Sequence, residues 1–247
     1  MYTLDDSIEE KIKALIDRDV EQDAELGGVG SGNIGHAGIV GHQGGSLPKG
    51  MSSHSSAVEK IKTIKEFEPG VTQEVQDLAK KYDGEMQGMD FRFKDPDSMA
   101  RQIEGKMEKD GLSIEDATGE VTDGLRYTML FPPETFTEKT KAVEAALIKK
   151  GWKLRDHLNC NFFGPDSVYE GYSSVWEDDQ GRIFEMQFHT PVSVAIRERN
   201  HKLYEIWRVS KSSRERDRLA NEMQAAWSDP AYVRPKNYQE LGIGGDV

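Results

Sequence analysis

The chain has 247 residues, 36% of them hydrophobic and 31% charged, which is enough to bury the core of one or two domains. Its net charge of −12 argues against sequence-independent binding to nucleic acid, so no DNA partner is expected, and no stretch approaches the roughly 20 apolar residues of a membrane span. The acidic N-terminus is unlike a signal peptide, and the only cysteine, Cys160, excludes an intrachain disulfide, so we expect a cytoplasmic protein.

The N-terminal part of the chain is expected to lie outside the folded domain. Residues 1–26 are acidic and carry apolar residues at helical spacing, which predicts an amphipathic helix that docks on the main domain or on a partner. Residues 27–54 are rich in glycine and histidine, with only isolated apolar side chains. Such a stretch cannot recover its ordering entropy by burial, so we interpret it as a flexible linker.

The folded domain is predicted to span residues 55–228. Helical periodicity over residues 55–82 is interrupted at Pro69-Gly70, which predicts two successive helices. Residues 91–94 alternate as a short strand, and the Asp-Pro-Asp-Ser sequence at 95–98 is typical of a helix start.

Three cations are expected to converge at this helix start. Arg92 and Lys94 share one face of the predicted strand, and Arg101 lies one turn into the helix. Cations near a helix N-terminus suit a polyphosphate. The same pattern is also compatible with surface charges that have no common target.

Residues 120–131 are predicted to form a buried strand that contains Asp123 and Arg126 on one face. A charged pair in a core strand is costly unless it has a partner or a ligand. A helix over 137–151 and a strand over 152–157 are expected to follow.

Residues 169–190 are predicted to form a hairpin with a turn at 177–181. Alternation in its second strand places Glu185, Gln187 and His189 on one face and Phe184, Met186 and Phe188 on the other. The first set is either a solvated strand face or an ordered group of a carboxylate, an amide and an imidazole. Two helices are expected over 191–208 and 213–227, followed by a tail at 229–247 that wraps around the domain or frays.

Five short motifs occur in a fixed order over roughly residues 60–210. They are Arg-x-Lys-x-x-x-Ser-x-x-Arg, Asp-x-x-Arg-Tyr-Thr, Tyr-x-Gly-Tyr-x-Ser, Glu-x-Gln-x-His-Thr and His-x-Leu-Tyr-Glu. In this order the chain resembles the synthetase domain of the RelA/SpoT family of nucleotide pyrophosphokinases, and it is most similar to the single-domain toxic members. The glycine- and histidine-rich segment resembles linkers of phage head-morphogenesis proteins and favours a phage or prophage origin.

The resemblance implies a role for each matched residue. The residues matched to the ATP-binding segment are Arg92, Lys94, Ser98 and Arg101, and we add Arg126 to the ATP-binding set. Asp123 matches the Mg²⁺-binding aspartate, and Tyr172 matches the tyrosine that stacks on the base of the acceptor nucleotide. Glu185 matches the catalytic glutamate. Gln187 matches the glutamine two residues on, and together with His189 it is expected on the acceptor side.

The chemistry of pyrophosphate transfer from ATP to a 3′-hydroxyl agrees with these roles. It needs neutralisation of the phosphate charge, a divalent cation and a base near the hydroxyl. Asp123 and Glu185 offer the oxygen ligands that Mg²⁺ prefers, and Glu185 is the best-placed general base.

The sequence departs from the family pattern at two places. The aspartate lies three residues before the strand arginine, whereas the long multidomain enzymes have it five residues before. His189 stands where the family usually has arginine, which removes a permanent cation near the acceptor. No hydrolase domain is expected before the synthetase domain, which favours the toxin interpretation.

These observations predict an α/β (α+β) fold, with a mixed, twisted sheet of about five strands flanked by helices, like that of nucleotidyltransferases. The expected function is transfer of pyrophosphate from ATP, with Mg²⁺, to a nucleotide or to the 3′ end of tRNA. An antitoxin or a phage protein is the expected macromolecular partner. The alternatives are a catalytically inactive, phage head-associated binding module of the same fold and a nucleotidyltransferase, although the paired-carboxylate strand motif of the latter is not found.

Overall fold

The computed structural model describes residues 52–155, 158–164, 167 and 169–242, so the predicted acidic helix and nearly all of the predicted linker lie outside the described residues. The centre of the fold is a six-stranded sheet in the order β1-β2-β6-β5-β3, with β4 also paired to β5. The strands are β1 (Glu85–Gln87), β2 (Arg126–Leu130), β3 (Lys153–Leu154), β4 (Cys160–Asn161), β5 (Tyr172–Glu177) and β6 (Ile183–His189). The sheet is mixed, because β2 and β6 run parallel while the other pairs are antiparallel.

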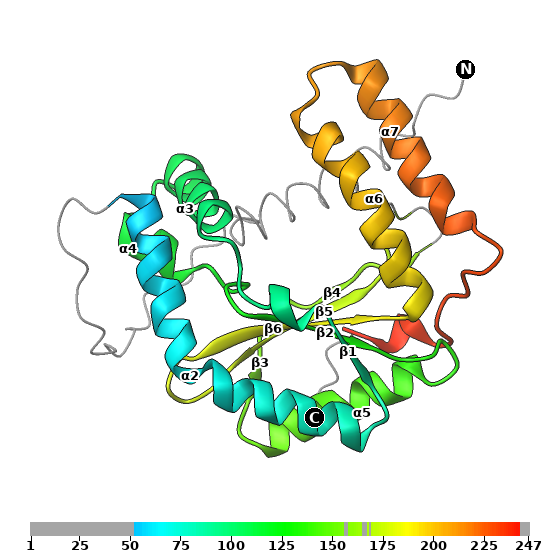
Figure 1. Ribbon diagram of the computed structural model, residues 1–247, viewed down its shortest axis with the longest axis horizontal. Coiled ribbons are helices and arrows are strands. Elements are labelled where there is room, and N and C mark those ends of the chain that lie inside the picture. The colour runs from blue at the N-terminus through cyan, green and yellow to red at the C-terminus, as the bar shows by residue number, and fades with distance from the viewer. Residues whose placement is uncertain (1–51, 156–157, 165–166, 168, 243–247) are drawn as a thin grey trace, which may run out of the picture.

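Helices cover the sheet on both sides, which confirms the predicted mixed fold. They are α2 (Ser53–Lys81), α3 (Pro96–Asp110), α4 (Ile114–Gly119), α5 (Phe136–Lys149), α6 (Pro191–Val209) and α7 (Ser213–Ala225). In Figure 1, α5 and the C-terminal half of α2 lie below the sheet. Above it, α3, α4 and the start of α2 stand on one side, and the α6–α7 pair stands on the other. Among the described helices, none is long and apolar enough to cross a membrane.

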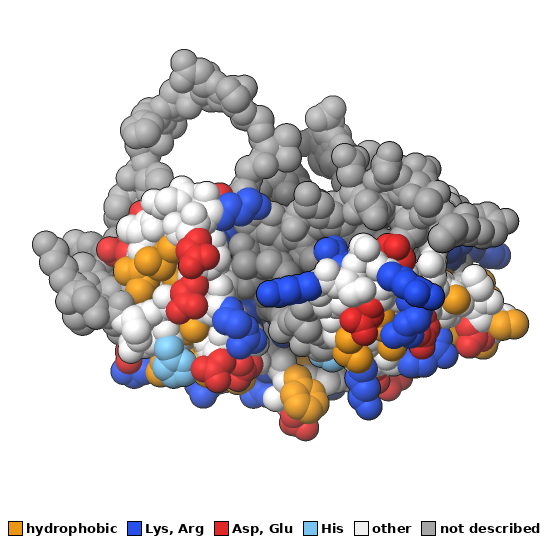
Figure 2. Space-filling view, turned by 90° about the horizontal axis from the view of Figure 1, so that it is seen from above, with side chains coloured by type: hydrophobic (Ala, Val, Ile, Leu, Met, Phe, Trp, Pro, Cys, Tyr) orange, Lys and Arg blue, Asp and Glu red, His pale blue; other side chains and the backbone are white. Residues whose placement is uncertain are grey.

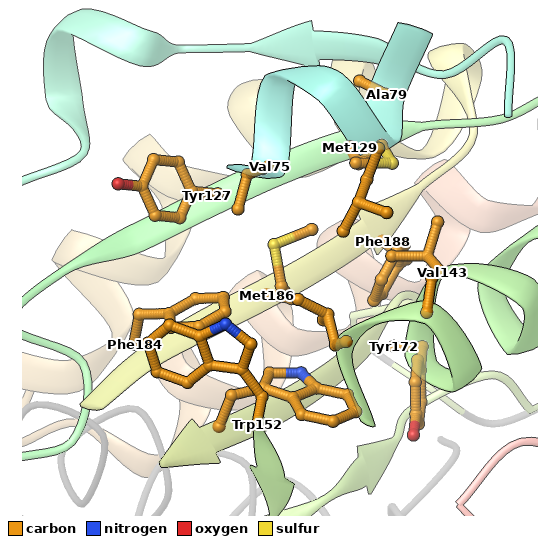
Figure 3. Close-up of a cluster of buried hydrophobic side chains, with 14 of the residues drawn as sticks. Val75, Ala79, Tyr127, Met129, Val143, Trp152, Tyr172, Phe184, Met186 and Phe188 are labelled. Carbon is orange, nitrogen blue, oxygen red and sulfur yellow. The ribbon is translucent and has the colours of Figure 1, made fainter. Parts of the chain in front are cut away.

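The main core lies between the sheet and the two helices below it. Alternation along β6 directs Phe184, Met186 and Phe188 into this core, as predicted, and each is fully buried (Figure 3). The residues of α2 and α5 that meet them are Val71, Val75, Leu78, Ala79, Val143, Ala146 and Leu147. Because the core takes one face of β6, the other face is left to polar side chains.

Helix α2 runs without interruption through Pro69, so the prediction of two helices was wrong. A proline inside a helix removes one hydrogen bond and bends the helix, and Figure 1 shows α2 changing direction along its length. Both halves nevertheless bury apolar residues: Ile61 packs with α3 and α4, and Val75 packs under the sheet. This burial outweighs the local cost of the proline.

The segment before β2 differs from the predicted long strand. Residues 114–119 form α4, and β2 begins only at Arg126. The predicted strand at 91–94 is reduced to a 3₁₀ turn over Met89–Phe91 and a single bridge between Phe93 and Leu125. This bridge nonetheless places Lys94 beside the end of the loop that carries Asp123.

The tail wraps around the domain as far as Gly242, the last described residue. Arg234 forms a two-pronged ion pair with Glu170, which is fully buried, and the shortest of its N–O distances is 2.6 Å. Asn161 on β4 donates hydrogen bonds to the carbonyl oxygens of Tyr238 and Leu241 at 2.7 and 3.2 Å. The tail is therefore part of the fold.

Candidate active site

Glu185 occupies the middle of β6, on the face of the sheet opposite the core. This polar face also carries Arg126, Thr128, Ser173 and Gln187, since Arg126 pairs with Glu185 across β2–β6 and Ser173 pairs with Gln187 across β5–β6. Oε1 of Glu185 accepts hydrogen bonds from Oγ of Ser173 and, at 3.3 Å, from Nε2 of Gln187. Oε2 is buried and has no hydrogen-bond partner among the described residues.

The protonation of Glu185 is shifted by its surroundings. Burial raises the pKa of its carboxyl, and the negative charge of Asp123 acts in the same direction. The charge of Arg126 and the hydrogen bonds from Ser173 and Gln187 oppose this rise in pKa. A buried carboxylate with a raised pKa and one unpaired oxygen is suited to accept a proton.

Asp123 is held beside this group by an ion pair. Nζ of Lys94 lies 2.6 Å from Oδ2 of Asp123, and both side chains are almost fully buried. Nη1 of Arg126 lies 3.8 Å from the same oxygen. A regular strand would direct residues three apart to opposite faces, and the two meet because Asp123 lies in the loop before β2. The predicted proximity is therefore present, for a different reason.

A glycine lets this loop approach the helices. A Cβ atom at Gly124 would lie 2.6 Å from Cδ1 of Ile64 and 3.1 Å from Cε of Met99. A side chain at position 124 would therefore require the terminal methyl groups of Ile64 and Met99 to move.

The two carboxylates fit a divalent cation that also binds substrate phosphates. Oδ1 of Asp123, like Oε2 of Glu185, is buried without a hydrogen-bond partner among the described residues. Mg²⁺ is typically bound by one or two carboxylates together with phosphate oxygens and water. Within the described part of the chain there is no group of three or more potential metal ligands.

The start of α3 contributes two further predicted residues. Asp95 caps the helix by accepting a hydrogen bond from the backbone N–H of Ser98 at 2.9 Å. Nη2 of Arg101 donates to Oγ of Ser98 at 2.8 Å, and Arg101 is exposed. Lys94 lies just before the cap, so a helix N-terminus, a hydroxyl and cations occur within eight residues of sequence.

The contacts of Arg92 are with residues outside the group formed by Lys94, Asp123 and Glu185. Its Nε lies 2.6 Å from Oε1 of Glu68, and its Nη1 donates to the carbonyl oxygen of Met89 at 2.7 Å. Its guanidinium also lies over the ring of Phe93, 4.8 Å from the centroid. These contacts direct Arg92 toward α2, so the predicted common face of Arg92 and Lys94 is wrong.

Tyr172 lies on the opposite side of the sheet from Glu185. It is 1% exposed, pairs with Phe188 across β5–β6, and donates a hydrogen bond from its hydroxyl to Oε1 of Glu144 at 2.7 Å (Figure 3). Its ring therefore packs in the core in this structure, and stacking on the acceptor base stays a prediction for Tyr172. The sequence placed Tyr172 in the hairpin but did not show which of its faces meets the core.

His189 shares the polar face with Glu185, as predicted, but it is fully buried. Its Nε2 lies 2.8 Å from the hydroxyl of Tyr169, and its Nδ1 lies 3.1 Å from Oγ of Ser193. Burial lowers the pKa of His189 well below its ordinary value, and the charge of Arg197 adds to this. The imidazole is therefore neutral at pH 7 and packs between β6 and α6.

Two lysines that the sequence did not single out hold the loop before Asp123. Nζ of Lys60 donates to the carbonyl oxygens of Thr118 and Gly119, and Nζ of Lys106 lies 3.0 Å from Oε2 of Glu120. Burial lowers the pKa of Lys60 to about 8; the charges of Lys106 and Arg155 also lower it, and the charge of Asp123 raises it. Lys60 lies three residues after Ala57 and four before Ile64, both buried, and this helical spacing is the signal that could have revealed it.

Comparison with known proteins gives likenesses in structure but not in sequence. No protein-family model matches the chain, and no curated protein matches its sequence. Similar solved structures include the Type VI effector Tas1, in complex with its immunity protein, at 19% identity and a TM-score of 0.41, covering 71% of this chain and 93% of that chain. Another is smu.1046c from Streptococcus mutans UA159, at 14% identity and a TM-score of 0.46, covering 70% and 88%.

A third is the small alarmone synthetase 1 from Bacillus subtilis, bound to its product pppGpp, at 15% identity and a TM-score of 0.42, covering 68% of this chain and 86% of that chain. An alarmone synthetase is thus among the proteins that the chain resembles in structure. At these identities the likeness concerns the fold alone.

Proposed function

We propose that the chain is an ATP-dependent pyrophosphokinase that transfers the β,γ-pyrophosphate of ATP to a 3′-hydroxyl. The observation that carries this proposal is the pair of buried carboxylates, Asp123 and Glu185, each with one oxygen that lacks a hydrogen-bond partner among the described residues. Lys94 and Arg126 lie beside them. Unpaired buried carboxylate oxygens are costly, so their presence beside cations favours a site that binds a metal ion and phosphates.

In the proposed reaction the 3′-oxygen of the acceptor bonds to the β-phosphorus of ATP. The bond between that phosphorus and the oxygen leading to the α-phosphorus breaks, and AMP leaves. The proton of the 3′-hydroxyl passes to Oε2 of Glu185, while Ser173 and Gln187 hold Oε1 in place. The raised pKa makes Glu185 a stronger base than an exposed glutamate.

Asp123, through its unpaired Oδ1, would hold Mg²⁺ together with the substrate phosphates, which leaves Oε2 of Glu185 to accept the proton. When bound, the ion supplies neutralisation of the phosphate charge. Lys94 and Arg126 add positive charge on the same side. Ser98 and Arg101 at the start of α3 would contact the outer phosphates of ATP. Figure 2 shows the molecule from above the sheet. Lysine and arginine side chains lie on both groups of helices that stand on this side of the sheet, the group at the left and the group at the right of Figure 1.

The acceptor in this proposal is a nucleotide, giving a product of the ppGpp or ppApp type, or the 3′ end of tRNA. The basic segment from Arg197 to Arg218, with eight lysines and arginines against four acidic residues, would suit either. Each transfer would consume one ATP, and unopposed activity would therefore burden the cell. The proposal accordingly includes a neutralising protein partner and a role as a toxin or phage effector in the bacterial cytoplasm.

A second candidate, a binding module of the same fold without activity, is favoured by two observations. Tyr172 is buried and Arg92 is paired with Glu68, so two of the predicted substrate contacts are engaged within the protein. This candidate predicts binding of ATP without turnover.

The test incubates purified protein with Mg²⁺ and γ-labelled ATP, offering GDP, GTP, AMP, ADP and deacylated tRNA separately. The expected result is label in at least one acceptor and its loss in Glu185→Gln. ATP binding without transfer to any of them would favour the binding module instead.

A further inference from the structure

Arg197 brings a guanidinium group to the polar face of the sheet. Helix α6 begins directly after β6, where Thr190 and Ser193 form a capping box that fixes the direction of the helix. Two turns into the helix, Nη1 of Arg197 donates to Oε1 of Gln187 at 3.0 Å. Gln187 in turn donates to Glu185, so Arg197 lies one side chain away from the proposed base.

The charge of Arg197 is not neutralised within the described part of the chain. No carboxylate of the described residues lies within ion-pair distance of its guanidinium, whereas Arg92 pairs with Glu68 and Arg234 pairs with Glu170. Arg197 is half-buried. A guanidinium has five N–H donors in a planar fork that matches phosphate, and Gln187 takes up only part of this capacity.

His189 does not supply positive charge at this place. Both of its ring nitrogens are engaged, by Tyr169 and Ser193, and the ring is neutral and inaccessible to solvent. The cation expected near the acceptor from the family pattern is therefore absent at position 189. Arg197, which lies on the helix that follows, provides a cation beside the same strand.

The spacing along β6 fits a nucleotide that extends from Glu185 to Gln187. Glu185 and Gln187 are two residues apart on one face of a strand, or about 6.6 Å. A ribose whose 3′-hydroxyl lies at Glu185 can therefore direct its 5′-phosphate toward Gln187 and Arg197.

We propose that Arg197, together with the amide of Gln187, binds the 5′-phosphate of the acceptor nucleotide, so that the enzyme accepts phosphorylated nucleotides and not free nucleosides. The inference rests on the proposed pyrophosphokinase activity. The phosphate belongs either to a free nucleotide or to the terminal nucleotide of tRNA. Either source presents the same chemistry to the guanidinium.

The test measures acceptor binding by calorimetry, with Mg²⁺ and a non-hydrolysable ATP analogue present. The probes are AMP, GMP, adenosine, guanosine and deacylated tRNA. The proteins are the wild type, Arg197→Gln, Arg197→Lys and the control Lys149→Gln, which changes an exposed lysine of α5, on the other side of the sheet. We expect a 5′-phosphorylated probe to bind more tightly than the nucleosides. Arg197→Gln should weaken that binding by about ten- to hundredfold, the range for a charged hydrogen bond. Arg197→Lys should weaken it less, and Lys149→Gln should bind like the wild type.

Three outcomes would overturn the phosphate site. They are equal binding of nucleosides and nucleotides, an unchanged affinity in Arg197→Gln, and an equal loss for nucleosides and nucleotides, which would show that Arg197 acts only by orienting Gln187. Loss confined to tRNA or to mononucleotides identifies the source of the phosphate.

Binding and transfer separate this inference from the proposed function. Phosphate-dependent binding that is lost in Arg197→Gln, without transfer to any acceptor, would support the phosphate site and contradict the pyrophosphokinase. Transfer to an acceptor whose affinity is the same in Arg197→Gln would support the pyrophosphokinase and contradict the phosphate site.

Discussion

Replacing Glu185 by glutamine should abolish transfer and at the same time stabilise the protein. The amide oxygen can keep the hydrogen bonds from Ser173 and Gln187, since both go to Oε1. Loss of a general base typically costs about 10²- to 10⁴-fold in rate, or about 3 to 5 kcal/mol in the activation barrier. Stability should rise by on the order of 1 kcal/mol, because a buried charge with an unpaired oxygen is removed.

The direction of the stability change follows from the raised pKa. The folded-state pKa of Glu185 lies above the ordinary value of 4.5, so between the two values the folded state binds more protons than the unfolded state. The stability of the wild type therefore falls as pH rises through that window, and Glu185→Gln should lose this part of the pH dependence.

The assays are transfer of label from γ-labelled ATP and chemical denaturation followed by circular dichroism between pH 4 and pH 8. Glu222→Gln serves as the control, since Glu222 is exposed on α7 and paired with Arg218. It should change stability by less than about 0.5 kcal/mol and leave transfer unchanged. Glu185→Gln with a rate within fivefold of the wild type would remove Glu185 as the base, and a strong destabilisation would show that its carboxylate is structural.

Three further substitutions test the structure around the site. Lys94→Met leaves the buried Asp123 with only the more distant Arg126 and should destabilise the fold by up to about 3 to 5 kcal/mol, less so when combined with Asp123→Asn; a stability near that of the wild type in denaturant would contradict the Lys94–Asp123 pair. Tyr172→Ala should cost about 3 to 5 kcal/mol of unfolding free energy, with Tyr172→Phe costing about 1, whereas a change confined to the acceptor KM would support the stacking role. Arg234→Met leaves Glu170 unpaired and should make residues 229–242 sensitive to limited proteolysis, and equal resistance would show that the tail is held elsewhere.

The hairpin and its polar face were predictable from the sequence because they depend on local patterns. Alternation in residues 183–189 and the turn sequence before them are properties of neighbouring residues. These were sufficient to place Glu185, Gln187 and His189 on one face. The long helix α2 was not predictable in the same way, since packing at both of its halves outweighs the proline in its middle.

The parts of the site that the sequence did not reveal depend on contacts between distant segments. Lys94 and Asp123 are 29 residues apart, and their ion pair depends on a single bridge between two short segments. The face of Tyr172 depends on its register against Phe188, which no local pattern specifies. Arg197 reaches Gln187 only because a capping box sets the direction of α6.

The central claim, that the site transfers pyrophosphate, is tested most directly by labelling ATP at two positions in parallel reactions. With α-labelled ATP the label should appear in AMP, and with γ-labelled ATP it should appear in the acceptor, in equal molar amounts. Label from the α-phosphate in the acceptor would identify a nucleotidyltransferase, and ADP as the product would identify a phosphoryl transferase. Either result would contradict the proposed reaction at Asp123 and Glu185.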